Sequence, residues 1–163
     1  MLCFGSKEPG VISSKAEELA EFFEQMDVAY EIETEMMKRQ WGKFMLNVGV
    51  NQTVAVYQTN YGGIQREGEA RDTMIAAMRE VIALSEKEGI DLTEEDLYYW
   101  LNILGTLGTN GKPSMAQDAE AHRPSEVELF AGAVIAFGRK HQIPTPVNDK
   151  LYDKINRMED QYQ

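Results

Sequence analysis

Hydrophobic and polar positions in the first 33 residues predict a strand, a helix and a second strand. The opening MLCFG is a short apolar run closed by glycine, which is typical of a buried strand. Apolar residues then recur at helical spacing over residues 16–26, and Ser14 precedes Glu17 by three positions, the spacing of a capping box. VAYEIE at residues 28–33 alternates as a strand does. This order is the βαβ unit of a parallel sheet.

From residue 34 onwards the apolar spacing is helical and predicts an all-helical domain. The expected helices cover residues 34–57, 67–88, 94–104 and 125–141, with a last one from residue 146. Gly89 is suited to end the second helix, and Thr93 to cap the third. Ser125 and Glu128 have capping-box spacing at the fourth helix start. Pro146 suits the first position of the last helix, where its missing N–H does no harm.

Composition and charge narrow the class of protein and its partners. The 163 residues are enough for one domain with a sizeable core, and they carry a net charge of −11 without a basic run. Nucleic acid and anionic membranes are therefore not expected partners. Cys3 is the only cysteine, which excludes an internal disulfide and suits a reducing cytoplasm. We find neither a membrane-spanning apolar run nor a signal pattern, so we expect a cytoplasmic protein. His122 and His141 have no cysteine or histidine partners at the spacing of a zinc site.

Three polar residues share one face of the long helix predicted at residues 34–57. Lys43, Asn47 and Asn51 are spaced four positions apart among apolar or small residues. A helix that is apolar nearly all round is usually buried, and burying such polar groups without partners costs about 1–3 kcal/mol each. The stripe is therefore either the solvated edge of the helix or the lining of a cleft in which a small polar ligand supplies the partners. Asparagine weakens a helix, which favours the cleft, but the pattern alone leaves both interpretations open.

Two further positions are candidates for ligand contacts, each with an ordinary structural alternative. Ser114, within the glycine-rich loop at residues 105–118, could present its hydroxyl and backbone N–H to a carboxylate at the start of a short helical turn. It could equally cap that turn and nothing more. Glu126 could contact a ligand, or could be an acidic residue in a first helical turn that favours the helix dipole.

Three segments together resemble the C-terminal domain of ketopantoate reductase, also called 2-dehydropantoate 2-reductase. They are WGKFMLNVGVNQ (41–52), PSMAQDAEAHRPSEVE (113–128) and IPTPVNDKLYDKI (143–155). The resemblance covers residues 34–163, and residues 1–33 look like the end of the family's nucleotide-binding domain. It implies a mainly α fold, an all-helical C-terminal domain of the 6-phosphogluconate-dehydrogenase-like type, preceded by a short βαβ segment.

The resemblance also implies an activity and a role for each candidate residue. The activity is the NADPH-dependent reduction of the keto group of ketopantoate to (R)-pantoate, in the biosynthesis of pantothenate and coenzyme A. By position, Lys43 would be the general acid that protonates the developing alkoxide. Asn47 and Asn51 would hydrogen-bond the substrate's hydroxyl and carbonyl groups. Ser114 would meet its carboxylate, and Glu126 would orient substrate and cofactor.

The sequence departs from the family pattern because it contains no G-x-G-x-x-G motif, which holds the phosphates of the cofactor. We therefore expect the chain to be a reductase C-terminal domain that is inactive alone. An alternative is a non-catalytic helical module for dimerisation or small-acid binding, derived from such a reductase. A third possibility is a related reductase of a different 2-keto acid. The two N-terminal strands leave open edges, so we also expect a homodimer through this region.

Overall fold

The computed structural model describes residues 2–162, which fold into two compact units. The chain passes from the first unit, Met1–Trp41, to the second, Gly42–Gln163, within helix α2 (Met36–Val56). The predicted boundary lies between residues 33 and 34, and the assignment of residues 1–33 to a nucleotide-binding domain stays a prediction. Among the residues described, no helix combines the length and apolarity that crossing a lipid bilayer requires.

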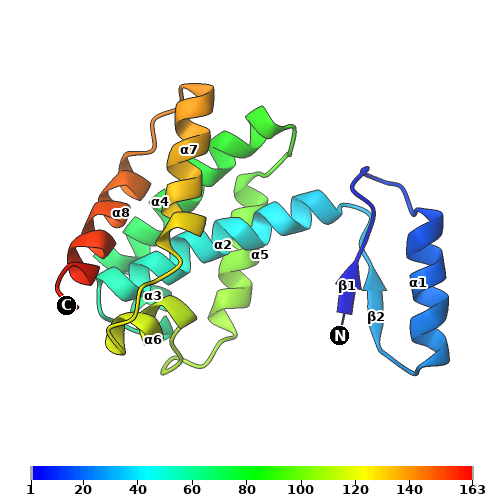
Figure 1. Cartoon of the computed structure of the whole chain (residues 1–163), viewed down its shortest axis with the longest axis horizontal. Helices are drawn as coiled ribbons and strands as arrows, with labels where there is room; N and C mark the ends of the chain where they lie inside the picture. Colours follow the sequence, from blue (N-terminus) through cyan, green and yellow to red (C-terminus); the bar gives the residue numbers. More distant parts are fainter. Residues whose placement is uncertain (1, 163) are drawn as a thin grey trace. The chain divides into compact units, whose positions relative to one another are not determined.

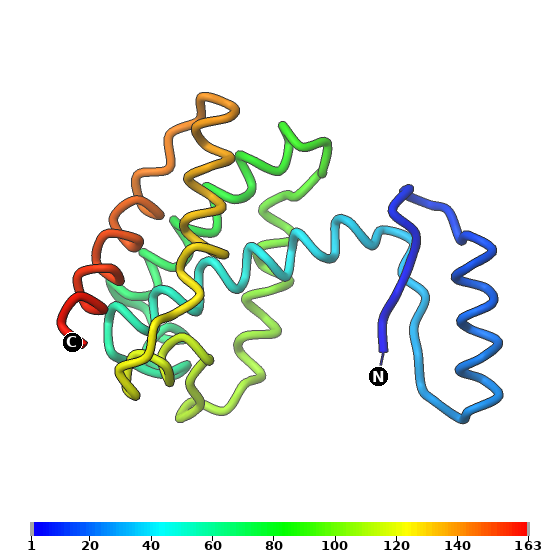
Figure 2. Tube along the Cα trace, viewed as in Figure 1, coloured from blue at the N-terminus to red at the C-terminus, as the bar shows by residue number. Residues whose placement is uncertain are grey.

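The first unit is a βαβ arrangement, as the hydrophobic pattern predicts. Strand β1 (Leu2–Phe4) pairs in parallel with β2 (Tyr30–Ile32), and helix α1 (Ser14–Gln25) connects them and lies beside the strands (Figures 1 and 2). Three rings join the helix to the sheet: Phe23 lies 5.6 Å from Phe4 and 6.0 Å from Tyr30, centroid to centroid. The apolar face of α1 is therefore the face that covers the strands.

The cap of α1 is one residue earlier than the sequence pattern predicts. Ser13 has an extended backbone (φ −77°, ψ 156°), and its hydroxyl accepts a hydrogen bond from Ala16 N at 3.3 Å. Ser14 is already the first helical residue, so the capping box that we expected between Ser14 and Glu17 does not form. Two adjacent serines are both able to cap, and here the backbone N–H of Ser13 is held by the hydroxyl of Ser6 at 2.9 Å.

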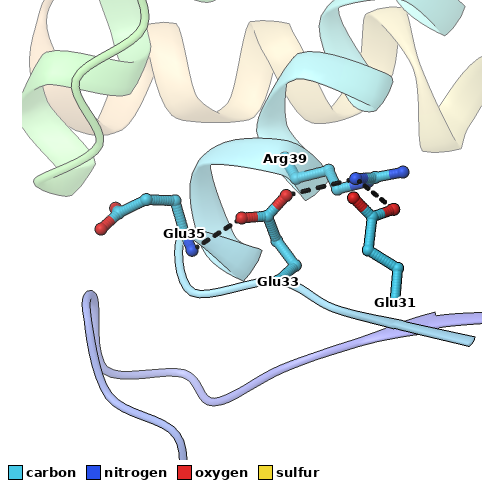
Figure 3. Close-up of polar contacts among 4 residues, drawn as sticks. All are labelled: Glu31, Glu33, Glu35 and Arg39. Atoms are coloured by element: carbon cyan, nitrogen blue, oxygen red, sulfur yellow. Dashed lines mark hydrogen bonds and ion pairs between the residues drawn. The ribbon is translucent and has the colours of Figure 1, made fainter.

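The start of α2 is fastened to the end of β2 within the first unit (Figure 3). Arg39 Nη1 lies 3.2 Å from a carboxylate oxygen of Glu31 and 3.2 Å from one of Glu33. The backbone N–H of Glu35 donates to Glu33 at 3.0 Å. That N–H and the Arg39 guanidinium together hold the pKa of Glu33 below its ordinary value.

The second unit consists of helices packed around the middle and C-terminal part of α2 (Figures 1 and 2). They are the α-helices α3 (Tyr61–Gln65), α4 (Glu69–Ser85), α5 (Glu94–Gly105), α6 (Ser114–Glu120), α7 (Ala131–His141) and α8 (Pro146–Glu159), and the 3-10 helices η1 (Glu86–Glu88) and η2 (Val127–Leu129). This arrangement confirms the mainly α fold class. It also confirms the stop at Gly89, whose φ is +75°, and the cap at Thr93, which forms a capping box with Asp96.

Two glycines let neighbouring helices approach α2 closely. A β-carbon at Gly49 would lie 2.5 Å from Met78 Cγ of α4. One at Gly42 would lie 2.2 Å from Trp100 Nε1 of α5. Both contacts are shorter than any van der Waals separation, so these positions are small because another helix occupies the space of a side chain.

The helix predicted over residues 125–141 is wrong in its first part. The chain forms η2 there, and α7 begins only at Ala131, because Phe130 (φ −108°, ψ −88°) is not helical. Ser125 is not a cap: its backbone N–H donates to Glu159 Oε1 at 2.9 Å, and its hydroxyl is buried without a hydrogen bond within residues 2–162. Glu128 instead accepts a hydrogen bond from the Tyr152 hydroxyl. The short helix α3 was not predicted.

Candidate functional site

The predicted polar stripe lies on one face of α2, and its residues differ in depth. Lys43 is exposed, Asn47 is half-buried, and Asn51 is only 9% exposed. At about 1.5 Å of rise per residue, the stripe extends over about 12 Å from Lys43 to Asn51. The interpretation of the stripe as a solvated helix edge is correct for Lys43. It is not correct for Asn51, which lies in the packed part of the helix.

Asn51 is the polar group on this face that most needs a partner. Its side chain is nine-tenths buried, and it makes no hydrogen bond to any of residues 2–162. The next residue, Gln52, is fully buried as well, but its amide donates two hydrogen bonds. The Asn51 amide is not among the buried polar atoms that lack a hydrogen bond, so the small exposed part of this residue includes its amide. A ligand with both a donor and an acceptor could therefore reach it and pair with it.

Lys43 is held against an aromatic ring rather than a carboxylate. Its Nζ lies 5.9 Å from the centroid of the Trp100 ring, within the range of a cation–π contact. No Asp or Glu among residues 2–162 forms an ion pair with it. Gly42, the preceding residue, makes room for the same indole. The ammonium is thus positioned without being neutralised by a neighbouring anion, so all its protons are available to a ligand.

Ser114 and Glu126 are brought to the C-terminal half of α2 by their neighbours in the chain. Ser114 is the first residue of α6 and Glu126 immediately precedes η2, and both side chains are exposed. Met115 and Val127, which follow them in the sequence, are buried in one apolar cluster. The same cluster contains Ala55, one helical turn beyond Asn51 on α2. The cluster consists of Ala55, Met115, Val127, Ala131, Ile135 and Ile155.

Lys43 lies away from that cluster along α2. The rise from Lys43 to Ala55 is about 18 Å along α2. A cavity of about 480 Å³ lies between the C-terminal ends of α2 and α8 and helix α6. Its lining includes Val54 and Ala55 of α2 and Gln58 just after this helix, but none of the five predicted residues. The candidate site consists of the polar face of α2 with Ser114 and Glu126 on adjoining elements.

Sequence reasoning missed Trp100 as a part of this site. The residue lies on α5, 57 positions from Lys43, and its spacing within an aromatic run carries no information about the partner that it packs against. One signal was present, because a glycine inside an otherwise regular helix often marks a close approach of another element. Gly42, next to the lysine, is such a glycine.

Comparisons with known proteins identify the class to which this helical domain belongs. The family model "Ketopantoate reductase PanE/ApbA C terminal" matches residues 35–159. A 2-dehydropantoate 2-reductase of Vibrio cholerae is 26% identical over 159 residues, which cover 96% of this chain and 53% of that protein. The crystal structure of a PanE/ApbA family ketopantoate reductase from Ralstonia eutropha JMP134 has a TM-score of 0.81 and 28% identity, covering 96% of this chain and 51% of that one.

The same fold occurs in a protein whose name describes a different substrate. The structure of D-mandelate dehydrogenase with NADH and anilino(oxo)acetate has a TM-score of 0.82 at 20% identity, covering 97% of this chain and 66% of that one. At this identity the likeness is one of fold alone.

The all-helical architecture, with its polar face on a central buried helix, is that of the C-terminal domain of a reductase. The chain belongs to the ketopantoate reductase family through this domain. It spans about half the length of the curated relatives that it matches. The resemblance that the three sequence segments indicate is confirmed, and so is the fold class that it implies.

Proposed function

We propose that the chain supplies the keto-acid-binding and proton-donating part of an NADPH-dependent 2-dehydropantoate 2-reductase. The observation that carries this proposal is Asn51, a nine-tenths buried carboxamide without a partner, on the helix face that also presents the unpaired ammonium of Lys43. A keto acid with hydroxyl and carbonyl oxygens has the donors and acceptors that such a face lacks. Family membership supports the assignment of the substrate class.

The residues of this chain fit the keto acid but provide no cradle for a dinucleotide, because the sequence contains no G-x-G-x-x-G. In the proposed reaction the keto carbon would receive a hydride, which is the chemistry that NADPH would supply when bound. The C=O bond becomes a C–O single bond, and its oxygen takes a proton from the Lys43 ammonium. The products are the hydroxy acid and NADP⁺, and Lys43 regains its proton from solvent.

Each predicted residue has a distinct task in this proposal. Lys43 stabilises negative charge on the keto oxygen before it donates the proton, which an ammonium without an anionic partner can do. Asn47 and Asn51 hold the hydroxyl and carbonyl groups, so that the keto oxygen faces the lysine. The Ser114 hydroxyl donates a hydrogen bond to the substrate carboxylate. Glu126 orients substrate and cofactor. These roles come from the resemblance, and the placement on one helix and its adjoining elements is compatible with them.

A second candidate is a non-catalytic module that binds a small acid or forms a dimer. The lack of a dinucleotide motif in the sequence favours it for this chain acting alone. A small-acid-binding module would also bind a keto acid on the α2 face and a dimerisation module would not, but only the reductase uses Lys43 to donate a proton. A reductase of another 2-keto acid differs from the first candidate only in the substrate that binds best.

Calorimetric binding of ketopantoate to the purified chain, together with an NADPH oxidation assay, tests the proposal. We expect binding without turnover, weakened about tenfold or more by Asn51→Ala, since a lost buried hydrogen bond costs about 1–3 kcal/mol. Asn102→Ala is the matched control, because Asn102 is an exposed asparagine of α5. Absence of binding by the unaltered chain would overturn the proposal. Turnover that survives Lys43→Ala would remove the lysine from the role of proton donor.

A further inference from the structure

Three polar side chains from three helices form a hydrogen-bonded chain in the core of the second unit. Gln52 of α2 and Asn148 of α8 are both 0% exposed, and Gln52 Nε2 donates to Asn148 Oδ1 at 3.1 Å. Asn148 Nδ2 donates in turn to Glu80 Oε2 of α4 at 2.7 Å. The residues are 96 and 68 positions apart in the sequence, so the contacts form only in the folded chain.

Glu80 fixes the direction of this chain of hydrogen bonds. Its carboxylate accepts from the backbone N–H groups of Val147 at 2.7 Å and of Asn148 at 3.0 Å, at the first turn of α8. A carboxylate can only accept, so the Asn148 amide must turn its NH₂ group towards Glu80 and its oxygen towards Gln52. A further hydrogen bond, from Asn148 Nδ2 to the carbonyl of Ala77 at 3.3 Å, holds the same orientation.

The direction matters for α2, because hydrogen bonds add an angular restraint on its rotation to the close contacts that it makes at Gly42 and Gly49. The helix is buried on several faces, by Met45, Leu46, Val48, Val50 and Val54. Non-directional contacts of this kind tolerate small rotations about the helix axis, whereas a hydrogen bond weakens steeply as its angle departs from linear. Gln52 directly follows Asn51, so any rotation of α2 that Gln52 resists would also turn the Asn51 amide.

The state of the Gln52 oxygen supports a positioning role over a purely stabilising one. Gln52 Oε1 is buried and makes no hydrogen bond to any of residues 2–162. An unpaired buried acceptor destabilises a protein, and a methionine of similar length would avoid it. The amide nitrogen, by contrast, makes two hydrogen bonds, to Asn148 and to the carbonyl of Val48 at 2.7 Å. What a glutamine adds here over an apolar residue is a directional link to α8.

We propose that Gln52 is a positioning residue, which is held by Asn148 and Glu80 and which sets the rotation of α2 so that Asn51 faces the ligand. This inference deepens the proposed function and rests on it for the identity of the ligand. The relationship between Gln52 and the Asn51 amide can be measured without any ligand, so the two proposals fail separately.

The test compares Gln52→Met with Thr53→Val in the full chain. Thr53 is a matched control, because it also lies within two residues of Asn51 and is 0% exposed, but its hydroxyl makes no hydrogen bond within residues 2–162. The primary readout is the pair of side-chain amide signals of Asn51 in ¹⁵N-correlated NMR spectra, assigned from their loss in Asn51→Asp. Calorimetric binding of ketopantoate is the second readout, and thermal unfolding reports on the fold.

We expect Gln52→Met to remain folded, to shift or broaden the Asn51 amide signals, and to weaken ketopantoate binding about tenfold. Thr53→Val should shift the Asn51 signals less than Gln52→Met does and should leave ketopantoate binding unchanged. Unmoved Asn51 signals in folded Gln52→Met would overturn the inference. If the unaltered chain binds no ketopantoate while the signals still move, the proposed function fails and the positioning role stands.

A second variant tests the far end of the hydrogen-bonded chain. Glu80→Gln keeps the shape of the side chain but replaces one acceptor oxygen with a donor, which competes with the Asn148 amide. We expect smaller shifts of the same Asn51 signals than in Gln52→Met. Unchanged signals would remove Glu80 from the positioning device.

Discussion

Trp100 lies so close to Gly42 that a β-carbon at position 42 would stand 2.2 Å from the indole nitrogen. The same ring lies beneath Lys43, whose Nζ is 5.9 Å from its centroid. One indole thus joins α5 to α2 and supports the ammonium on the candidate site. The glycine is a condition of that arrangement, because any side chain at position 42 competes with the ring for the same space.

Gly42→Ala should therefore displace the Trp100 indole and destabilise the chain by about 1–3 kcal/mol, as overpacking does. Urea unfolding gives the free energy, and the indole N–H signal of Trp100 reports the displacement. Gly105→Ala is the control, because a β-carbon there meets nothing within 4 Å, and alanine favours a helix more than glycine does. The packing described here is wrong if Gly42→Ala unfolds like the unaltered chain with the indole signal unmoved.

An ion-pair cluster at the 3-10 helix η1 should make the stability of the fold depend on pH. Glu88 accepts hydrogen bonds from Lys140 Nζ at 2.6 Å and from His141 Nε2 at 2.5 Å. Lys140 first, and His141 second, hold the pKa of Glu88 below its ordinary value in the folded chain. A group whose pKa is lower in the folded state stabilises the fold above its unfolded pKa, and this contribution is lost as the pH falls through the folded value.

Melting temperatures of the unaltered chain and of Glu88→Gln, measured from about pH 6 to about pH 3, test this dependence. The unaltered chain should melt higher at the upper end, and the difference should shrink as Glu88 is protonated. Glu86→Gln, at an exposed position two residues earlier, should show no such convergence. If the melting temperatures of Glu88→Gln and of the unaltered chain change with pH in parallel, the ionised Glu88 adds no stability through this cluster.

Periodicity predicted most of the fold, and it failed where two local signals competed. The long helix around Lys43 and the stop at Gly89 follow directly from spacing and from glycine chemistry. The pair Ser13 and Ser14 offered two equally good caps, and the backbone decided between them through the hydroxyl of Ser6. At Phe130 a regular apolar pattern continued while the backbone left the helix, because tertiary packing overrode local preference there.

Residue spacing predicted the part of the candidate site that lies on one helix, whereas Ser114 and Glu126 were assigned their roles by the family resemblance. Lys43, Asn47 and Asn51 are related by a four-residue spacing, which the sequence displays directly. The contact of Lys43 with Trp100 and the link from Gln52 to Asn148 join helices that are far apart in the sequence. No spacing rule encodes such pairs, and a single buried glutamine in an apolar helix does not by itself reveal its partner.

The first unit exposes more apolar surface than its small sheet can cover. Strands β1 and β2 pair only with each other among the residues described, and α1 is the helix beside them. Parallel sheets are normally covered on both faces, and two strands alone are marginally stable. The exposed apolar residues of this unit are Leu2, Val11, Ile12, Leu19, Phe22, Met26 and Val28. We therefore predict that the chain self-associates through this unit.

Light scattering coupled to size-exclusion chromatography measures the association, and Phe22→Glu locates it. Phe22 is 54% exposed on α1, so a glutamate there should leave the fold intact while it opposes burial against a second copy. Leu129→Glu is the matched control, because Leu129 is 64% exposed in the second unit. A dimer that Phe22→Glu dissociates and Leu129→Glu does not would place the contact on the βαβ unit. A monodisperse monomer of the unaltered chain would show that this apolar surface drives no association.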